Sequence, residues 1–165
     1  MNRRMLLLGS AAIALVAAAL LPRRLILSNP ANAESFEVTR TDAEWRGILS
    51  DAQFAVLRQE DTERPWTSPL LNEHRKGVFH CAGCDLAAYS SDTKFDSGTG
   101  WPSFWQAEPN AVGTRTDNSL LMTRTEVHCR RCGGHFGHVF DDGPPPTGKR
   151  HCINGLALAF RPAAA

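Results

Sequence analysis

The chain has 165 residues, of which 42% are hydrophobic and 21% charged, and its formal net charge at pH 7 is +1. These values exclude a fibrous or a largely disordered chain and favour one globular domain of modest size. No basic tract with interleaved aromatic residues is present, so nucleic acid is not an expected partner.

The first 33 residues have the pattern of an export signal. Arg3 and Arg4 precede an uncharged, mostly apolar run at 5–21, and small residues follow at 31–33, where a signal peptidase requires them. The adjacent arginines predict the twin-arginine route, so we expect cleavage and a periplasmic mature protein. The alternative is an uncleaved membrane anchor at 5–21, because this run is near the minimum length for a membrane span.

Two short helices are expected at the start of the mature domain. Thr41 with Glu44, and Ser50 with Gln53, have the spacing of capping boxes. One predicted helical face combines three apolar residues: Trp45, Ile48 and Leu49. After the signal we expect a short linker at 34–40, the main domain at 41–161 and a tail at 162–165.

From Gly77 onward the pattern changes to short alternating segments, which are typical of β-strands. Turns rich in glycine and proline separate these segments at 96–102 and 141–148. The expected strands lie at 77–81, 120–128, 138–140 and 156–160, with a further one around Cys152. The sequence therefore predicts a small, mainly β, antiparallel fold with a helical N-terminal segment.

Four of the five cysteines form two C-x-x-C pairs: Cys81 with Cys84, and Cys129 with Cys132. Two such turns can complete a tetrahedral site of four thiolates, which favours one Zn²⁺ ion. Four thiolates leave no open coordination position, so we expect a structural zinc that ties two distant hairpins together. Two local disulfides, or one redox-active C-x-x-C, are the alternatives, since exported proteins often contain disulfides.

The fifth cysteine, Cys152, has no partner in such a pair. The alternation of a strand places it on one face with Arg150 and Asn154, and a cationic neighbour lowers a thiol pKa and favours the reactive thiolate. His135 and His138 follow the second cysteine pair, and a thiolate near imidazoles is suited to nucleophilic attack with proton delivery. An inert, buried thiol is the alternative.

An aromatic cluster follows the glycine turn in "GWPSFW" at 100–105, with Trp101, Phe104 and Trp105. Such clusters usually belong to a core. In a loop with glycine and proline, however, Trp101 and Phe104 can also form the wall of a substrate pocket.

Together these segments resemble the methionine-R-sulfoxide reductases. The motifs that match are "CAGC", "TKFDSGTGWPSF", "CRRCGGHFGHVFDDGP" and "RHCIN", in this order, and the resemblance extends over nearly the whole mature chain. It implies two small antiparallel sheets with a zinc clip. It also implies repair of oxidised proteins by reduction of the R epimer of methionine sulfoxide, and we expect a monomer.

The resemblance also implies roles for individual residues. Cys152 matches the nucleophile, and Trp101 matches the wall that receives the sulfoxide methyl group. Arg150 matches a basic position beside the nucleophile, which we count with the substrate-binding residues. The positions that match the polar group around the sulfoxide oxygen are His135, His138 and Asn154, and those that match the zinc ligands are Cys81, Cys84, Cys129 and Cys132.

The sequence departs from the family pattern at Thr99, where many members have a resolving cysteine. With four thiols on zinc, no cysteine would remain to form a disulfide with Cys152. Regeneration of Cys152 must then come from an external thiol, either a thioredoxin-like protein or a small molecule. The alternative functions are a non-catalytic, zinc-clipped β module that binds a ligand, and a glutathione-dependent carbon–sulfur enzyme with an open zinc site.

Overall fold

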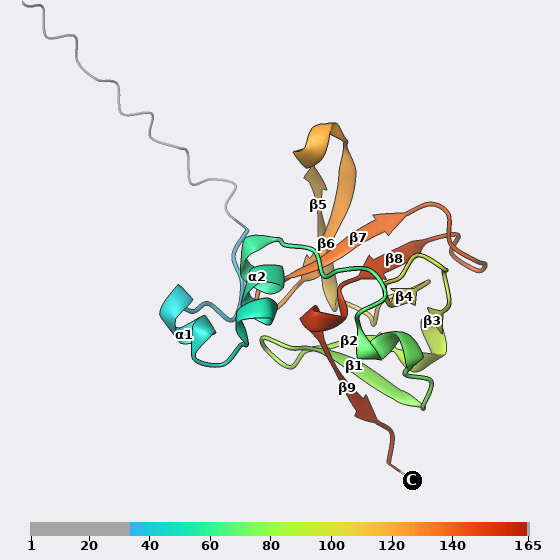
Figure 1. The fold of residues 1–165 in the computed structure, drawn as a ribbon, viewed down its shortest axis with the longest axis horizontal. Helices are drawn as coiled ribbons and strands as arrows, with labels where there is room; N and C mark the ends of the chain where they lie inside the picture. Colours follow the sequence, from blue (N-terminus) through green and yellow to red (C-terminus); the bar gives the residue numbers. More distant parts are fainter. Residues whose placement is uncertain (1–33, 165) are drawn as a thin grey trace, which may run out of the picture. The chain divides into compact units, whose positions relative to one another are not determined.

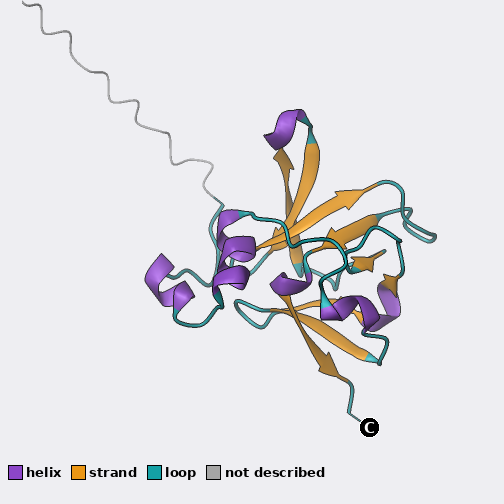
Figure 2. Ribbon diagram, in the orientation of Figure 1, coloured by secondary structure: helices purple, strands orange, loops and turns teal. Residues whose placement is uncertain are grey.

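The computed structural model describes residues 34–164, except the side chain of Leu120. The predicted export signal at 1–33, with the alternative anchor at 5–21, lies outside the described residues. Among the residues that are described, no helix is long and apolar enough to cross a membrane. The described chain is mainly β, with short helices before the first strand (Figures 1 and 2).

The two predicted N-terminal helices are present, as α1 (Asp42–Arg46) and α2 (Asp51–Gln59). Both predicted capping boxes are formed, since each cap side chain and the third helical residue exchange hydrogen bonds with the opposite backbone N–H. The predicted apolar face is wrong at one position: Trp45 and Leu49 are buried, but Ile48 is 54% exposed. The reason is that α1 ends at Arg46, so helical periodicity does not extend to Ile48.

In the described part of the chain, nine strands form two antiparallel sheets, as the resemblance implied. The smaller sheet has the order β2-β1-β9 and the larger one the order β3-β4-β8-β7-β6-β5. The strands of the smaller sheet are β1 (Gly77–Cys81), β2 (Ala87–Ser90) and β9 (Leu158–Pro162). Those of the larger sheet are β3 (Lys94–Phe95), β4 (Ser103–Phe104), β5 (Val112–Asp117), β6 (Arg124–Cys129), β7 (His135–Phe140) and β8 (Arg150–Ile153). Short 3₁₀ turns lie between consecutive strands at η3 (Ser91–Thr93), η4 (Ser119–Leu121) and η5 (Gly155–Ala157), and a further one, η2 (Pro69–Asn72), lies between α2 and β1.

Two of the expected strands begin later than the alternation predicted. The segment 120–128 starts in the turn η4, where Leu121 and Met122 are exposed, and becomes β6 only at Arg124. Similarly, Leu156 lies in η5 and β9 begins at Leu158. Alternation of residue types cannot distinguish a strand from the turn that leads into it, whereas the hydrogen-bonded ladder does.

Aromatic side chains from both sheets meet in one buried core. Phe79 of β1 and Tyr89 of β2 contact Phe104 of β4, with ring centroids 5.0 Å and 4.4 Å apart. All three rings have no exposed surface. The core therefore holds the smaller sheet against the larger one, and the larger sheet contains the strands of the candidate site.

Candidate active site and metal centre

The register between β7 and β8 brings Cys152 and His138 together, although 13 residues separate them in the sequence. They are direct partners in the antiparallel ladder. Side chains of directly opposed residues project from the same face of a sheet, with Cβ atoms about 5 Å apart. The ladder thus places the thiol and the imidazole on one face without help from a loop.

Gly137 allows this pairing to be close. A Cβ atom at Gly137 would lie 2.0 Å from the carbonyl oxygen of Cys152, and its φ of +155° is one that residues with side chains rarely adopt. A larger residue would push β7 away from β8. The glycine between the two histidines of "HFGH" is therefore a requirement of the site.

A cavity of about 140 Å³ lies over this face of the sheet. It combines four of the predicted site residues: Trp101, His138, Cys152 and Asn154. The residues that the sequence analysis did not select are Thr62, Arg124, Gly137 and Phe140. Two of these come from segments distant in sequence, the connection after α2 and strand β6, so no motif around Cys152 could indicate them.

Opposing effects act on the pKa of the Cys152 thiol. Burial raises its pKa above the usual value, while the Thr99 hydroxyl and the Arg150 guanidinium lower it, and burial is the largest of these. Arg150 lowers the pKa of Cys152, as its position beside the thiol in the sequence predicts. The net direction is nevertheless upward, because most of the thiol surface is removed from water.

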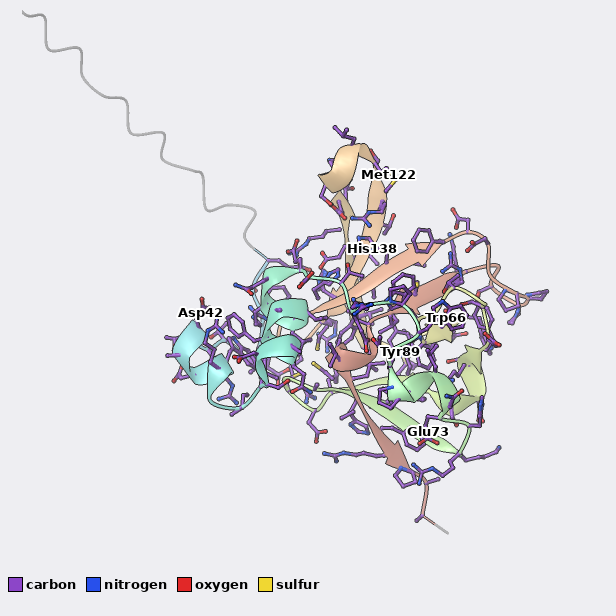
Figure 3. All side chains as sticks on the ribbon, viewed as in Figure 1. Asp42, Trp66, Glu73, Tyr89, Met122 and His138 are labelled. Carbon is purple, nitrogen blue, oxygen red and sulfur yellow. The ribbon has the colours of Figure 1, made fainter. Side chains whose placement is uncertain are left out.

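His138 is held by a carboxylate from the neighbouring hairpin. Its Nε2 atom lies 2.8 Å from Oδ2 of Asp117, at the end of β5. A carboxylate can only accept, so Nε2 carries the hydrogen and Nδ1 is left to interact with a ligand. Burial lowers the pKa of His138, and the contact with Asp117 opposes that effect. Figure 3 labels His138 among the strands of the larger sheet.

His135 lies outside the cavity that contains Cys152. Its side chain is buried, and Nδ1 is 2.7 Å from Oε1 of Glu126. It lines an adjoining cavity, which it shares with His138 and Glu126. The His135 and His138 rings are neighbours, with centroids 5.5 Å apart, but of the two only His138 lines the cavity with Cys152.

Two of the predicted substrate-binding residues do not line the cavity. Phe104 has no exposed surface and belongs to the core, so the prediction that it forms the pocket wall is wrong. Arg150 is mostly buried as well, and it donates two hydrogen bonds of 2.9 Å to Asp142. Its guanidinium also lies over the Phe140 ring, 4.5 Å from the centroid. Arg150 can therefore affect Cys152 by its charge, but it does not line the substrate cavity.

Glu63 fixes two walls of the cavity and was not found from the sequence. Its backbone oxygen accepts a hydrogen bond of 2.8 Å from the indole Nε1 of Trp101, and its backbone N–H donates to Oδ1 of Asn154 at 2.9 Å. Its buried carboxylate accepts from the N–H of Leu156. Asn154 also donates to the carbonyl of Phe136, so most of its amide is used to hold the backbone.

Thr99 occupies the position where the resemblance implies a resolving cysteine in other proteins. Its hydroxyl oxygen lies 3.9 Å from the sulfur of Cys152. It also lies 2.9 Å from the Ser97 hydroxyl, which in turn is 2.7 Å from the Ser103 hydroxyl. A side chain at position 99 is thus directly beside the thiol, and in this chain it cannot form a disulfide.

His151, the neighbour of Cys152, faces the opposite side of the strand, as alternation predicted. Burial lowers its pKa to about 4, so the ring is neutral at pH 7. Its Nδ1 atom lies 3.2 Å from the Tyr89 hydroxyl, which can donate to it. This residue supports the core and has no part in the cavity.

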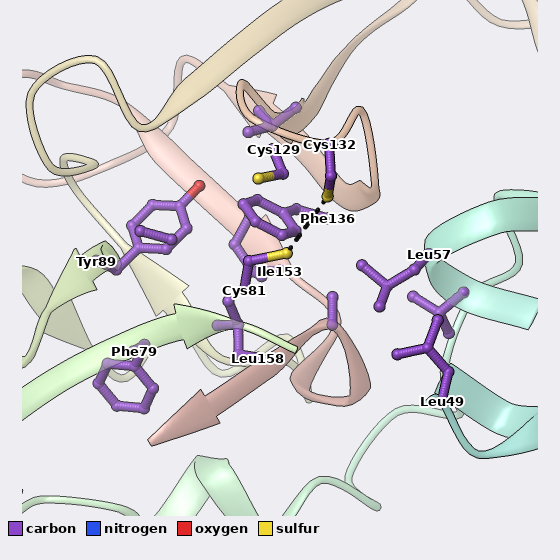
Figure 4. Close-up of a cluster of buried hydrophobic side chains, with 14 of the residues drawn as sticks. Leu49, Leu57, Phe79, Cys81, Tyr89, Cys129, Cys132, Phe136, Ile153 and Leu158 are labelled. Carbon is purple, nitrogen blue, oxygen red and sulfur yellow. Dashed lines mark hydrogen bonds between the residues drawn. The ribbon is translucent and has the colours of Figure 1, made fainter. Parts of the chain in front are cut away.

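The two C-x-x-C pairs come together as the spacing predicted. Their four sulfur atoms all lie within 4.8 Å of one another. Two pairs of sulfur atoms that combine the motifs are 3.7 Å apart, for Cys81 and Cys132, and 3.5 Å apart, for Cys84 and Cys129. A disulfide would need about 2.05 Å, so these four cysteines are free thiols or metal ligands. Figure 4 shows Cys81, Cys129 and Cys132 beside the core residues Phe136 and Ile153.

The comparisons with known proteins agree with this arrangement. The SelR domain family matches residues 49–162. The chain belongs to the SelR-domain family. Its relatives include three proteins that are each named peptide methionine sulfoxide reductase MsrB. The protein from Agrobacterium fabrum is 50% identical over 127 residues, 76% of this chain and 94% of the relative. The proteins from Thiobacillus denitrificans and Methanosarcina barkeri are also 50% identical, over 78% and 75% of this chain and 98% and 88% of their own lengths.

The SelR match includes both strands of the candidate site and all four clustered cysteines. The segment before residue 49, with α1, lies outside it. The residues of the cavity and of the sulfur cluster therefore belong to the shared domain.

Proposed function

We propose that this protein reduces the R epimer of methionine sulfoxide in oxidised proteins, with Cys152 as the nucleophile. The observation on which the proposal depends is the cavity that joins the fifth cysteine to His138 and the Trp101 indole. The relatives named peptide methionine sulfoxide reductase MsrB, at 50% identity over most of the chain, support the same reaction.

The reaction follows from the polarity of the sulfoxide. The Cys152 thiolate attacks the sulfoxide sulfur while one proton is delivered to the oxygen. A bond between the two sulfur atoms forms as the sulfur–oxygen bond of the substrate breaks, and the oxygen takes up a second proton and leaves as water. A water molecule then attacks the Cys152 sulfur and breaks the sulfur–sulfur bond, so methionine and one proton leave and Cys152 becomes a sulfenic acid, oxidised by two electrons. Two external thiols then reduce the sulfenic acid to the Cys152 thiol. They become one disulfide, and the oxygen of the sulfenic acid leaves as one water molecule.

Cys152 and His138 together supply the thiolate and the proton. With the thiol pKa raised and the imidazole pKa lowered, the pair holds a single proton at neutral pH, and that proton rests mainly on sulfur. Its transfer to His138 creates the thiolate and the imidazolium in one step. Asp117 favours the imidazolium, because its carboxylate accepts the hydrogen bond from Nε2.

Trp101 is suited to select the epimer. Its indole is fixed by the hydrogen bond to Glu63, so it presents a rigid apolar wall to the substrate methyl group. If the methyl group packs against this wall while the oxygen faces His138, only one configuration at sulfur exposes the sulfur to Cys152. Asn154 contributes by holding the backbone around the cavity.

The sulfur cluster fits one Zn²⁺ ion in a structural role. A tetrahedron with metal–sulfur bonds of 2.3 Å has sulfur–sulfur edges of about 3.8 Å, close to the distances of 3.7 Å and 3.5 Å between the two C-x-x-C pairs. Four adjacent thiolates repel one another, and a dication removes that repulsion. When bound, the ion would supply cross-linking of the two sheets and no chemistry at Cys152.

The physiological setting is also part of the proposal. The twin-arginine pattern in the first 33 residues supports export to the periplasm, where the mature protein would act as a monomer with a thioredoxin-like protein or a small thiol. The mass of the mature N-terminus distinguishes cleavage near Ala33 from an uncleaved anchor at 5–21.

The test is a reduction assay with separate R and S epimers of a methionine sulfoxide peptide and dithiothreitol as reductant. The mature protein should reduce the R epimer, and the Cys152→Ser variant should show no turnover while it keeps its fold and metal. Retained turnover in that variant would contradict the assignment of the nucleophile. If the unmodified protein bound the R epimer without reducing it, a non-catalytic binding module would be the better description.

A further inference from the structure

Trp101 lines two cavities. Besides the small cavity at Cys152, it borders a larger one of about 500 Å³. We call the larger cavity the Trp66 groove, and the residues that define it here are Trp66, Asn72, Glu73, Lys94, Asp96 and Trp101. The groove lies between η2 and its following loop on one side and β3 on the other. Figure 3 labels Trp66 and Glu73 on the side of the molecule with β3 and β4.

We propose that the Trp66 groove binds the polypeptide segment that flanks the methionine sulfoxide of a protein substrate. The inference rests on the proposed function and specifies a part of the substrate that Cys152 and its cavity do not contact. A cavity of about 140 Å³ is below the usual size of a ligand site, about 300–1,000 Å³, and holds little more than one side chain. The groove falls within that range and begins at the same indole.

Trp66 is an exposed aromatic residue in an unusual conformation. It is 65% exposed, and its φ of +67° lies in the left-handed region, which bulky residues rarely adopt. The backbone N–H of Trp66 donates a hydrogen bond of 2.8 Å to the carbonyl of Gly100. A Cβ atom at Gly100 would lie only 3.0 Å from the indole nitrogen of Trp66. Backbone strain of this kind concentrates at functional sites, and exposed tryptophans are frequent binding hot spots.

The two sides of the groove are connected before any substrate arrives. The Lys94 ammonium on β3 donates a hydrogen bond of 2.9 Å to the carbonyl of Leu71 in η2. The Trp101 indole is fixed in the same way by Glu63. A preformed groove loses little conformational entropy when a peptide binds, which favours affinity.

The polar groups of the groove have no dominant sign. Glu73 is neutralised by Arg75, with nitrogen and oxygen 2.6 Å apart, and Lys94 and Asp96 have opposite charges. Lys94 keeps donors beyond the one that it gives to Leu71, and the Asn72 amide can both donate and accept. An aromatic edge with such donors and acceptors suits a polypeptide main chain, whereas an anionic polymer would require an excess of basic side chains.

The experiment compares two substrates with dithiothreitol as the only reductant. One is N-acetyl-methionine-R-sulfoxide methylamide, and the other is a heptapeptide of serine and alanine with methionine-R-sulfoxide at its centre. The Trp66→Ala variant should lower the ratio of kcat/KM for the heptapeptide to that for the short substrate by about tenfold, mainly through KM. Asn72→Trp, which obstructs the groove from its other side at an exposed position, should lower the same ratio.

Trp105→Ala serves as the matched control, because Trp105 is a half-buried tryptophan of the same loop region that does not line the groove. Its ratio should equal that of the unmodified protein. A second measurement does not depend on turnover. Calorimetry should show that the double variant Cys152→Ser, Trp66→Ala binds the heptapeptide about tenfold more weakly than Cys152→Ser alone.

The outcomes separate the inference from the proposed function. If Trp66→Ala and Asn72→Trp change both substrates equally, or neither, the groove does not bind the flanking segment. If their effect appears only when thioredoxin replaces dithiothreitol, the groove binds the reductant, which also overturns the inference. If the unmodified protein reduces neither substrate, the proposed function fails and the inference fails with it.

Discussion

Cys152 and His138 are opposed on neighbouring strands, and in the proposed mechanism they share one proton. Below the pKa of His138 both groups are protonated, and no thiolate is available. Above the pKa of Cys152 both have lost their protons, and no acid is available. Activity therefore requires the intermediate state with one proton on the pair.

We expect kcat/KM to follow a bell-shaped pH profile with a broad plateau. Burial lowers the pKa of His138 from its usual 6.5, so the acid limb should lie below that value. Burial also raises the pKa of Cys152 from 9.0, so the alkaline limb should lie above that value. Arg150→Gln removes a positive charge that lowers the thiol pKa, and it should move the alkaline limb to higher pH.

Lys149→Gln is the control for Arg150→Gln, since Lys149 is an adjacent cation that pairs with Asp141 and is not among the main influences on the pKa of Cys152. Its profile should match that of the unmodified protein. An alkaline limb that stays in place in Arg150→Gln would show that this arginine acts on the structure alone.

Thr99→Cys should create a resolving thiol. The hydroxyl that it replaces lies 3.9 Å from the Cys152 sulfur, so a thiol at this position is close enough to form a disulfide after a small adjustment. After one turnover without reductant, the unmodified protein should hold a sulfenic acid, about 16 Da heavier, that reacts with a dimedone-type reagent. The variant should instead hold a disulfide and be recycled faster by thioredoxin.

Thr114→Cys, at an exposed position on β5, is the matched control and should behave like the unmodified protein apart from its extra thiol. Intact-mass measurement after a single turnover decides between these products. A disulfide between Cys152 and one of the four clustered cysteines in the unmodified protein would mean that the sulfur cluster is labile and acts as the resolving partner.

At the scale of the elements, the site depends on the connection between α2 and η2. This segment has no regular structure of its own, yet Glu63 within it forms hydrogen bonds with Trp101, Asn154 and Leu156. Ser68 lies so close to Gly155 that a Cβ atom there would approach its hydroxyl oxygen to 1.8 Å. The segment thus packs tightly on the turn after β8 and closes the cavity from the side.

Glu63→Ala should weaken this attachment. It removes the acceptor of the Leu156 N–H, and loss of a buried hydrogen bond to a charged group costs about 1–3 kcal/mol of folding free energy. Because Trp101 and Asn154 are held through the same residue, KM for the sulfoxide should rise more than kcat falls. Glu63→Gln keeps an acceptor and should restore KM; an equal KM in all three proteins would show that the segment does not position the cavity.

At the scale of the whole molecule, the sulfur cluster joins the two sheets. Cys81 ends β1 of the smaller sheet, Cys129 ends β6 of the larger one, and the other two cysteines follow in the adjoining turns. A domain of this size has one modest core, so a metal that cross-links the sheets adds substantially to stability. The free energy of binding at such sites is on the order of 10 kcal/mol in small zinc domains.

Cys81→Ser and Cys129→Ser should therefore lose metal and solubility first, and activity only as a consequence. Metal content, measured by atomic emission, and thermal unfolding are the observables, and Cys152→Ser is the control with the metal retained. A Cys81→Ser protein that folded normally with one zinc per chain would show that the four cysteines do not form the site.

How much could be predicted from the sequence depended on the range of the contacts. Both helix starts were predictable, because a capping box involves residues three positions apart. The sulfur cluster was predictable as well, since each pair is a local turn and a metal site requires the two turns to meet. The end of α1 and the start of β6 were not, because they depend on packing and on the strand ladder.

The sequence by itself determined the fold class, the four clustered cysteines and the unpaired thiol of Cys152. Only the tertiary structure decided that His138 shares the cavity while His135 does not, and that Trp101 forms its wall while Phe104 lies in the core. Each of these pairs lies three residues apart in one motif, so local sequence treats its members alike. The register of β7 on β8 and the hydrogen bond between Trp101 and Glu63 are long-range contacts that place His138 and Trp101 at the cavity. Other long-range contacts hold the second member of each pair elsewhere, because Glu126 binds the His135 ring and the aromatic core encloses Phe104.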